Sequence, residues 1–283
     1  MARFIQIPTR ASFYDGAFDG VVGWSAAGMG YIIVGESGKL TVIDGGNHED
    51  AEQIIALLQK YSGESVPTVD LWIITHSHLD HYGALKEIAT NDALCRSLKI
   101  KKLLYYFPPE YRDHKDNFCN LAPIEEMKEI GARTGALHHV PHTDESFELD
   151  GIKFHFIYVP EDCEPINRHF NSNLCSLVFT VECNRKLMIT GDAFKVNLGI
   201  IVENNRGKLK CDILQLPHHA LCDTGSEEFY REVDAKAVIL PISIAGDRSM
   251  GTIYYEQNGA NRAAAERAER VIRAYDGVVE LDI

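Results

Sequence analysis

The sequence predicts a layered α/β or α+β domain, in which helices cover β-sheets. Short apolar runs rich in β-branched residues end abruptly in polar residues, and segments with helical spacing lie between these runs. Two further segments alternate around turn residues, as antiparallel hairpins do. No linker, internal repeat or low-complexity tract interrupts the 283 residues, so we expect a single domain over residues 1–283.

Five apolar runs have the length and composition of buried strands. In chain order they cover residues 39–46 (KLTVIDGG), 69–78 (VDLWIITHSH), 186–192 (KLMITGD), 212–219 (DILQLPHH) and 237–243 (AVILPIS). The polar residues at which they end include Asp44, His76, Asp192 and His218. Because open sheets tend to place their functional groups at strand ends, we expect these side chains to meet at one edge.

Five segments have the residue pattern of helices, and two have that of hairpins. The predicted helices cover residues 49–61, 81–90, 122–134, 226–233 and 261–275, and the last has the clearest helical spacing. The predicted hairpins cover residues 146–159, with a turn at 150–151, and 176–190, with a turn at 184–185. Residues 247–261 lack a strong pattern, so they are either a plain connection or a substrate loop.

The chain is acidic, with 41 acidic and 28 basic side chains and a formal net charge of -13. This balance argues against tight nucleic-acid binding, because an acidic surface repels phosphate backbones. It does not exclude a nuclease, since bound divalent cations reverse the local field. The sequence has no apolar run of about 18 residues and no secretory signal pattern, so we expect no membrane association and a cytoplasmic location.

The cysteines form an odd set of seven without a C-x-x-C pair, at positions 95, 119, 163, 175, 183, 211 and 222. This pattern argues against both a disulfide framework and a structural zinc ribbon. We interpret them as reduced thiols that mostly fill the core.

The segment ITHSHLDHYGA, residues 74–84, places three histidines and an aspartate within six positions directly after an apolar run. His76 and His78 are two apart on extended backbone, so both imidazoles point to one side, and Asp80 and His81 follow on the next turn. Imidazole nitrogen and carboxylate oxygen suit zinc, manganese or iron, and the absence of cysteine ligands favours a catalytic site. The segment therefore predicts a metal centre.

Four ligands this close together cannot complete two coordination shells, so other strand ends must contribute. Asp192 is the best candidate, because Gly191 lets the backbone turn sharply and a carboxylate can bridge two ions. His218 has the same strand-end setting, whereas His219 points elsewhere on extended backbone, so we expect only one of the pair to be a ligand. Asp44 either orients a ligating histidine or caps the helix that follows it.

The order of Asp44, THSHLDH, TGD and PHHA resembles that of the metallo-β-lactamase fold hydrolases, and the resemblance covers residues 28 to 245. It implies a four-layer αββα sandwich with a one- or two-metal site at one edge of the paired sheets. Residues 173–178 and 218–226 resemble, within this family, the branch that contains the hydrolase domain of the ComEC DNA-uptake proteins. Ala220 and Leu221 replace a glycine and a serine of that branch, so its substrate contacts do not transfer to this loop.

Carried over to this sequence, the resemblance implies two divalent metal ions, with zinc ahead of manganese and iron. The ligands implied for the first ion are His76, His78 and Asp192, and those for the second are Asp80, His81, His218 and Asp192. Asn173 stands where many family members supply a third histidine to the first ion, which makes it a candidate extra ligand; His169 is an alternative. Asp80 is expected to orient the hydroxide that the ions generate and to accept its proton.

Three functions are compatible with these residues. The leading hypothesis is hydrolysis of a phosphodiester, in a nucleic acid or a small nucleotide, because the ComEC resemblance is combined with a two-metal layout. The same hydroxide could hydrolyse a carboxylic ester, lactone or thioester, which the acidic surface favours. The third is a regulatory protein that binds metal at a decayed site, and the presence of both Asp80 and Asp192 argues against it.

Overall fold

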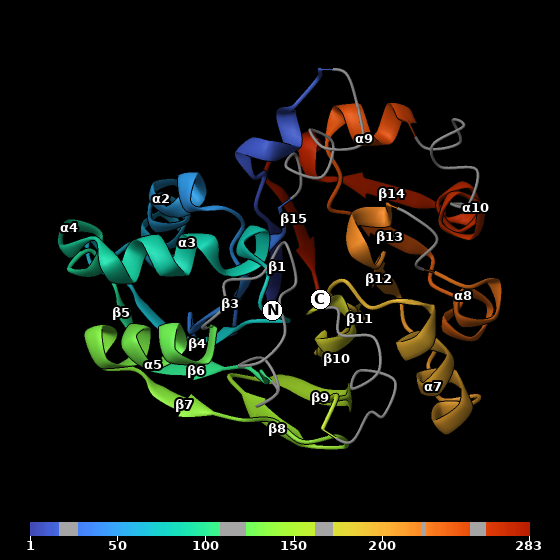
Figure 1. Cartoon of the computed structure of the whole chain (residues 1–283), viewed down its shortest axis with the longest axis horizontal. Helices are drawn as coiled ribbons and strands as arrows, with labels where there is room; N and C mark the ends of the chain where they lie inside the picture. Colours follow the sequence, from blue (N-terminus) through green and yellow to red (C-terminus); the bar gives the residue numbers. More distant parts are fainter. Residues whose placement is uncertain (17–27, 108–122, 162–171, 222–224, 250–258) are drawn as a thin grey trace.

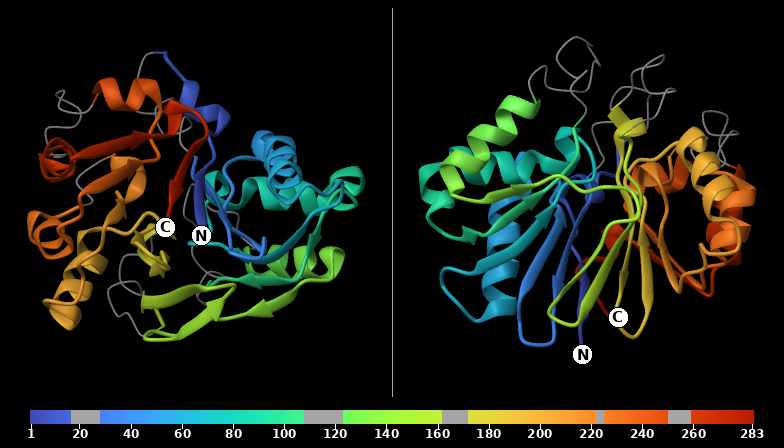
Figure 2. Two further views of the ribbon diagram at one scale, coloured as in Figure 1. Left: turned by 180° about the vertical axis from the view of Figure 1, so that it is seen from behind. Right: turned by 90° about the horizontal axis from the view of Figure 1, so that it is seen from below.

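The computed structural model of the chain is a sandwich of two β-sheets with helices on both outer faces (Figures 1 and 2). It describes residues 1–16, 28–107, 123–161, 172–221, 225–249 and 259–283. In the right-hand view of Figure 2 the sheets stand in the middle, and helices flank them on each side. The predicted αββα architecture of four layers is therefore confirmed.

The first sheet has eight strands within the described residues, in the order β15-β1-β2-β3-β4-β6-β7, with β5 also paired to β4. Strands β3, β4, β6 and β7 are parallel, and β15, β1, β2 and β3 are antiparallel. The strands are β1 Arg3–Gln6, β2 Gly30–Val34, β3 Leu40–Asp44, β4 Thr68–Ile73, β5 Lys99–Ile100, β6 Lys102–Leu104, β7 Leu137–His139 and β15 Val279–Asp282. The two ends of the chain thus lie side by side in one sheet (Figure 1).

The second sheet has seven strands within the described residues, in the order β14-β13-β12-β11-β10-β9-β8. Strands β11 to β14 are parallel, and β8 to β11 are antiparallel. The strands are β8 Ser146–Leu149, β9 Ile152–Tyr158, β10 Val178–Glu182, β11 Lys186–Ile189, β12 Ile213–Gln215, β13 Ala237–Leu240 and β14 Arg270–Arg273. Both predicted hairpins, β8–β9 and β10–β11, are confirmed.

Helices cover the outer face of each sheet. Apolar residues of α2, α3 and α5 pack on the first sheet, and those of α7, α8 and α10 pack on the second. The helices are α2 Ala51–Ser62, α3 Leu79–Thr90, α4 Asp92–Cys95, α5 Pro123–Thr134, α7 Lys195–Asn205, α8 Glu227–Val233, α9 Ile244–Ser249 and α10 Gly259–Arg267. Of these, α4, α7 and α9 were not predicted from the sequence.

The central strands are apolar on both faces because each lies between a helix layer and the other sheet. In β3, Val42 packs toward the helices and Ile43 toward the second sheet. In β4, Trp72 packs toward the helices and Ile73 toward the second sheet. Successive strand residues point to opposite faces, so a continuous apolar run is what a strand in this position requires. The inter-sheet core holds the two sheets together directly beneath the edge at which their polar strand ends meet.

The predicted helix at residues 261–275 is wrong in its second half. Helix α10 ends at Arg267, and residues 270–273 form β14, an edge strand parallel to β13. Within this strand Ile272 is 2% exposed and joins the inter-sheet core. Pairing with β13 and burial of Ile272 outweigh the helical propensity of the local sequence, which contributes only tenths of a kcal/mol per residue.

The described cysteines agree with the prediction that these thiols fill the core. Cys175 and Cys211 are buried, and Cys95 and Cys183 are partly buried. Cys119, Cys163 and Cys222 lie outside the described residues. Within the part of the chain that the structure describes, no helix is long and apolar enough to cross a membrane.

Candidate metal centre

The candidate site lies where the strand ends of both sheets meet. Strand β3 ends at Asp44, and β4 leads through Thr75 to His76. Strand β11 leads to Asp192, and β12 leads to the pair His218 and His219. Because β3 is parallel to β4 and β11 is parallel to β12, each pair of carboxyl ends lies side by side. The topology, and not nearness in sequence, brings these side chains together.

Two compact groups of potential metal ligands share one carboxylate. Asp80, His81, Asp192 and His219 form the four-residue group, and His76, His78 and Asp192 form the three-residue group. In each group the ligand atoms lie within 4.8 Å of one another. Asp192 belongs to both, which is the arrangement expected of a carboxylate between two cations.

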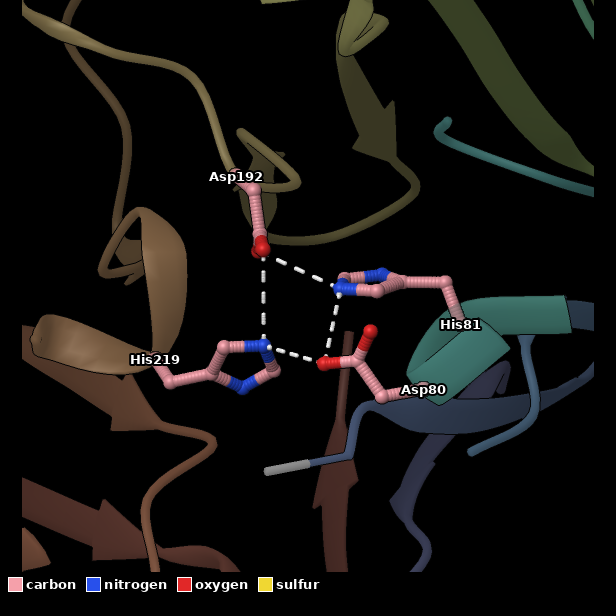
Figure 3. A group of neighbouring side chains, drawn as sticks. All are labelled: Asp80, His81, Asp192 and His219. Atoms are coloured by element: carbon pink, nitrogen blue, oxygen red, sulfur yellow. Dashed lines mark ion pairs between the residues drawn. The ribbon is translucent and has the colours of Figure 1, made fainter. Parts of the chain in front are cut away.

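Figure 3 shows the four-residue group, in which Asp80 and His81 come from the first turn of α3. His219 Nε2 lies 3.1 Å from Asp80 Oδ2 and 3.4 Å from Asp192 Oδ2. His81 Nε2 lies 3.3 Å from Asp192 Oδ1. The side chain of Asp80 is 24% exposed, whereas those of the other three are at most 3% exposed. Asp80 is therefore the member of the group that faces the solvent.

The residues present fit a divalent cation. Among the described residues, buried side-chain atoms without a hydrogen-bond partner include His76 Nε2, His81 Nε2, His219 Nε2 and Asp192 Oδ1. Buried polar atoms that lack a partner are costly, and here they come from the two groups that share Asp192. A cation coordinated by these nitrogens and oxygens would satisfy them, and imidazole with carboxylate is a donor set that zinc, manganese and iron accept.

Two of the imidazoles are held by their second ring nitrogen. His81 Nδ1 lies 2.8 Å from Asp44 Oδ2, and the same carboxylate accepts hydrogen bonds from the backbone and the hydroxyl of Thr75. His219 Nδ1 lies 2.8 Å from the carbonyl oxygen of Pro241. Donation from Nδ1 to these acceptors leaves Nε2 of each ring as the atom that faces Asp192, which is the tautomer that a metal requires.

The structure differs from the sequence-based expectation at the tandem histidines. It places His219, and not His218, in the four-residue group, while His218 Nε2 lies 3.9 Å from Asp192 Oδ2. The expectation assumed extended backbone, but His218, His219 and Ala220 all have positive φ, at 51°, 55° and 57°. This left-handed turn aims both imidazoles at Asp192, and nothing in the residue types of the segment signals such a conformation.

Burial lowers the pKa of the imidazoles, and the neighbouring carboxylates raise it. Burial lowers the pKa of His219, but Asp192 and Asp80 more than offset it and raise the pKa to about 10. The pKa of His81 is likewise raised despite burial, through Asp192 and Asp44. By contrast, burial lowers the pKa of His76, and it lowers the pKa of His218 to about 4. The carboxylates around His81 and His219 therefore favour positive charge on these imidazoles, at the place where a divalent cation would supply it.

The turn that carries Asp192 is fixed by buried hydrogen bonds. The backbone N–H of Asp192 donates to Ser176 Oγ at 3.0 Å. The Gln215 side chain accepts from the backbone of Thr190 at 2.8 Å and donates to the carbonyl of Gly191 at 3.0 Å. Gly191 has φ 52°, and a Cβ there would lie 3.0 Å from Thr75 Cβ and 3.1 Å from Ser176 Oγ. The sharp turn predicted for Gly191 therefore exists, and the position leaves little room for a side chain.

Gly191→Ala is expected to lower the free energy of unfolding by about 1–2 kcal/mol from backbone strain, with crowding against Thr75 in addition. The displaced turn should also weaken cation binding. Chemical denaturation and cation titration measure the two effects. Gly207→Ala is the matched control, because Gly207 has φ 76° and no atom within 4 Å of the added Cβ. Unchanged cation affinity in Gly191→Ala would contradict the placement of Asp192.

Four further expectations from the sequence concern Asn173, His169, residues 247–261 and Asp44. Asn173 is buried in the short helix Ser172–Cys175, and its function as an extra ligand stays a prediction. His169 lies outside the described residues, as does most of the 247–261 segment. The carboxylate of Asp44 bonds to Thr75 and His81. The helix that follows it is capped by Asn47 and Asp50, so the alternative in which Asp44 is the cap does not apply.

A sequence model of one protein family, described as the metallo-beta-lactamase superfamily, matches residues 27–240. The chain belongs to this superfamily. The match includes strands of both sheets and all the residues of the two ligand groups. With this membership and its His/Asp cluster, the chain is a metal-dependent hydrolase of the metallo-beta-lactamase superfamily. No sequence among the curated proteins matches it.

Several solved structures, among them the metallo-beta-lactamase fold protein YhfI, resemble the chain over its whole length. YhfI from Bacillus subtilis has 12% sequence identity and a TM-score of 0.58, with 99% of this chain and 100% of that one covered. Zn²⁺-bound PqqB from Methylobacterium extorquens has 12% identity and a TM-score of 0.56, with both chains fully covered. A diphosphatase from the PhnP family has 16% identity and a TM-score of 0.54, with 100% and 98% covered. At these identities the likeness shows the fold alone.

Proposed function

We propose that this metal-dependent hydrolase cleaves phosphodiesters with the help of two divalent cations, zinc first among the candidates, manganese and iron next. The observation that carries the proposal is the sharing of Asp192 by two ligand groups. His76, His78 and Asp192 would hold one cation, and Asp80, His81, Asp192 and His219 would hold the other. When bound, such a pair lowers the pKa of water and stabilises both the attacking and the leaving oxygen of an in-line displacement at phosphorus.

Residues of the chain itself would orient the attacking water and hold the ligating histidines in place. Asp80 is the partly exposed member of its group, so its carboxylate can orient the attacking water and accept its proton. Asp44 holds His81 by Nδ1, and the Pro241 carbonyl holds His219, so neither imidazole has to reorganise during the reaction. The inter-sheet core beneath the site keeps these groups rigid, which is the condition for electrostatic stabilisation of a transition state.

Two likenesses support phosphorus as the reaction centre. Residues 173–178 and 218–226 resemble the branch of the superfamily that contains the ComEC hydrolase domain. A solved structure of the same fold is a diphosphatase. The net charge of -13 opposes a long nucleic-acid substrate except where cations reverse the field, so a small nucleotide is the preferred form of the phosphodiester.

A substrate panel tests the proposal. Protein loaded with zinc or manganese is assayed against bis(p-nitrophenyl) phosphate, cyclic nucleotides, single-stranded DNA and RNA, and against an ester, a lactone and a thioester. We expect turnover of phosphodiesters, with the small ones ahead of the polymers. Asp80→Asn should depress turnover, and His142→Ala, at an exposed surface position, should not.

Turnover of the acyl substrates alone would overturn the proposal in favour of an esterase. Inactivity toward every phosphodiester, in protein shown to contain two cations, would overturn it as well. Asp192→Ala protein purified in the same way controls for contaminating phosphatases and nucleases, because it lacks the shared ligand.

A further inference from the structure

A cavity of about 240 Å³ lies in the helix layer that covers the second sheet, and residues of α8, α10, β12 and β13 line it. In Figure 1 these helices stand on the opposite side of the molecule from α2 and α4. Asp234 and Lys236 line the cavity just before β13 begins, at the amino end of this strand. The metal ligands follow the carboxyl ends of their strands, and none of the described residues of the two ligand groups lines the cavity. The cavity is therefore separate from the metal centre.

The floor of the cavity is apolar. Leu214 of β12, Val238 of β13 and Ala264 of α10 line it and are 1%, 2% and 8% exposed. Tyr230 of α8 adds an aromatic ring, and its hydroxyl donates a hydrogen bond to Asn261. The volume exceeds the roughly 150 Å³ of an apolar cavity that accepts benzene. It is smaller than the roughly 300 Å³ at which sites for drug-sized ligands begin. The floor thus has room for one ring or a short branched chain.

The remaining charged residues of the lining differ in how they are paired. The five charged lining residues are Glu227, Arg231, Asp234, Lys236 and Arg267. Asp234 forms an ion pair with Lys210, whose Nζ lies 3.2 Å from its Oδ2. Lys236 Nζ lies 3.8 Å from Glu269 Oε1. The charges of Asp234 and Lys236 are therefore largely balanced by residues beyond the cavity, which leaves three charged side chains to face a ligand.

These three are Glu227, Arg231 and Arg267, on the two helices that border the cavity. Within the part of the chain that the structure describes, none of them has an ion pair or a side-chain hydrogen bond. Two guanidinium groups and one carboxylate leave an excess of one positive charge, in a chain whose net charge is -13. A guanidinium group matches a carboxylate through two parallel hydrogen bonds. An excess of one charge suits a monoanion, and Glu227 would repel a dianion such as a phosphate monoester.

We propose that the cavity between α8 and α10 binds a small carboxylate with an apolar body. The guanidinium groups of Arg231 and Arg267 hold the carboxylate, and the apolar body lies on Leu214, Val238 and Ala264. Removal of the body from water contributes affinity, while the arginines select the charge. The proposal uses no residue of the metal centre, so it is independent of the proposed phosphodiester function.

The experiment is a calorimetric titration of the metal-loaded protein with phenylacetate. Wild type is expected to bind one equivalent with a dissociation constant of about 1 mM or tighter. Arg231→Ala and Arg267→Ala should each weaken binding by about fivefold or more. Arg96→Ala, which replaces an exposed arginine directly after α4, is the matched control and should bind as wild type does. Phenyl phosphate and phenethylamine should bind more weakly than phenylacetate.

Asp192→Ala separates the cavity from the metal centre, where a carboxylate could also coordinate a cation. This variant should bind phenylacetate as wild type does, because Asp192 does not line the cavity. Ala264→Leu should abolish binding, since the larger side chain fills the apolar floor. Circular dichroism shows whether each variant is folded, and Ala264→Val repeats the test if Ala264→Leu is not.

Four results would overturn the proposal. The first is no heat of binding in wild type at about 10 mM phenylacetate. The second is unchanged affinity in both arginine variants. The third is loss of binding in Asp192→Ala, which would place the probe at the metal centre. The fourth is tighter binding of phenyl phosphate or phenethylamine, which would contradict the assignment to a carboxylate. Because the titration measures no turnover, none of these results bears on phosphodiester hydrolysis.

Discussion

Asp192→Ala is expected to remove both cations and to reduce hydrolysis by roughly 10²–10⁴-fold, since metal ions supply several kcal/mol of transition-state stabilisation. Asp192 is the only residue common to both ligand groups of the described chain. Its carboxylate lies within 4 Å of imidazole nitrogens of His76, His81, His218 and His219. Removal of this one side chain therefore opens both groups at once, whereas loss of any single histidine opens one.

Elemental mass spectrometry of protein purified without added metal measures the first effect. Wild type should contain about two equivalents of zinc, manganese or iron, and Asp192→Ala close to none. Asp192→Asn keeps the shape of the side chain and separates loss of charge from loss of packing. Asp282→Ala, at an exposed aspartate of β15, is the control for purification. Metal content that is equal in wild type and Asp192→Ala would place the cations elsewhere.

Asp44→Asn is expected to weaken cation binding at the four-residue group by about 10- to 100-fold, as removal of a partner that orients a metal-bound histidine typically does. The carboxylate accepts three buried hydrogen bonds, two from Thr75 and one from His81. An amide offers a single acceptor oxygen, so part of this network becomes unsatisfied. The free energy of unfolding should fall by about 1–3 kcal/mol.

Asp150→Asn is the matched control for Asp44→Asn. Both aspartates have φ 55°, a conformation that Asn tolerates, and both accept backbone hydrogen bonds. Asp150, however, is in the exposed β8–β9 turn, where it accepts from Ser37 and Lys39. Zn²⁺ titration should show weaker binding at the four-residue group in Asp44→Asn. Asp150→Asn should bind Zn²⁺ as tightly as wild type does. Equal behaviour of the two variants would mean that Asp44 only stabilises the fold.

The local sequence was sufficient for β3 and β4 of the first sheet, for β8 to β13 of the second sheet and for the histidine segment, but not for the remaining strands. Strands β3, β4 and β11 are buried on both faces, so their apolar runs are continuous and easy to recognise. The ligand types within residues 76–81 and the Gly191-Asp192 turn are likewise local features. Such features depend on the period of a strand and on the chemistry of side chains, and neither requires knowledge of what lies across the fold.

Only the tertiary structure decided which tandem histidine joins the four-residue group, because that choice depends on the left-handed turn at residues 218–220. This turn is held by contacts distant in sequence, such as the bond from His218 N–H to the Gly191 carbonyl at 3.1 Å. The same holds for β14. Its sequence has a helical pattern, but the segment forms a strand because it pairs with β13. It also holds for Asp44, which contacts His81 across 37 positions of sequence. Local propensity amounts to tenths of a kcal/mol per residue, and tertiary packing outweighs it wherever the two conflict.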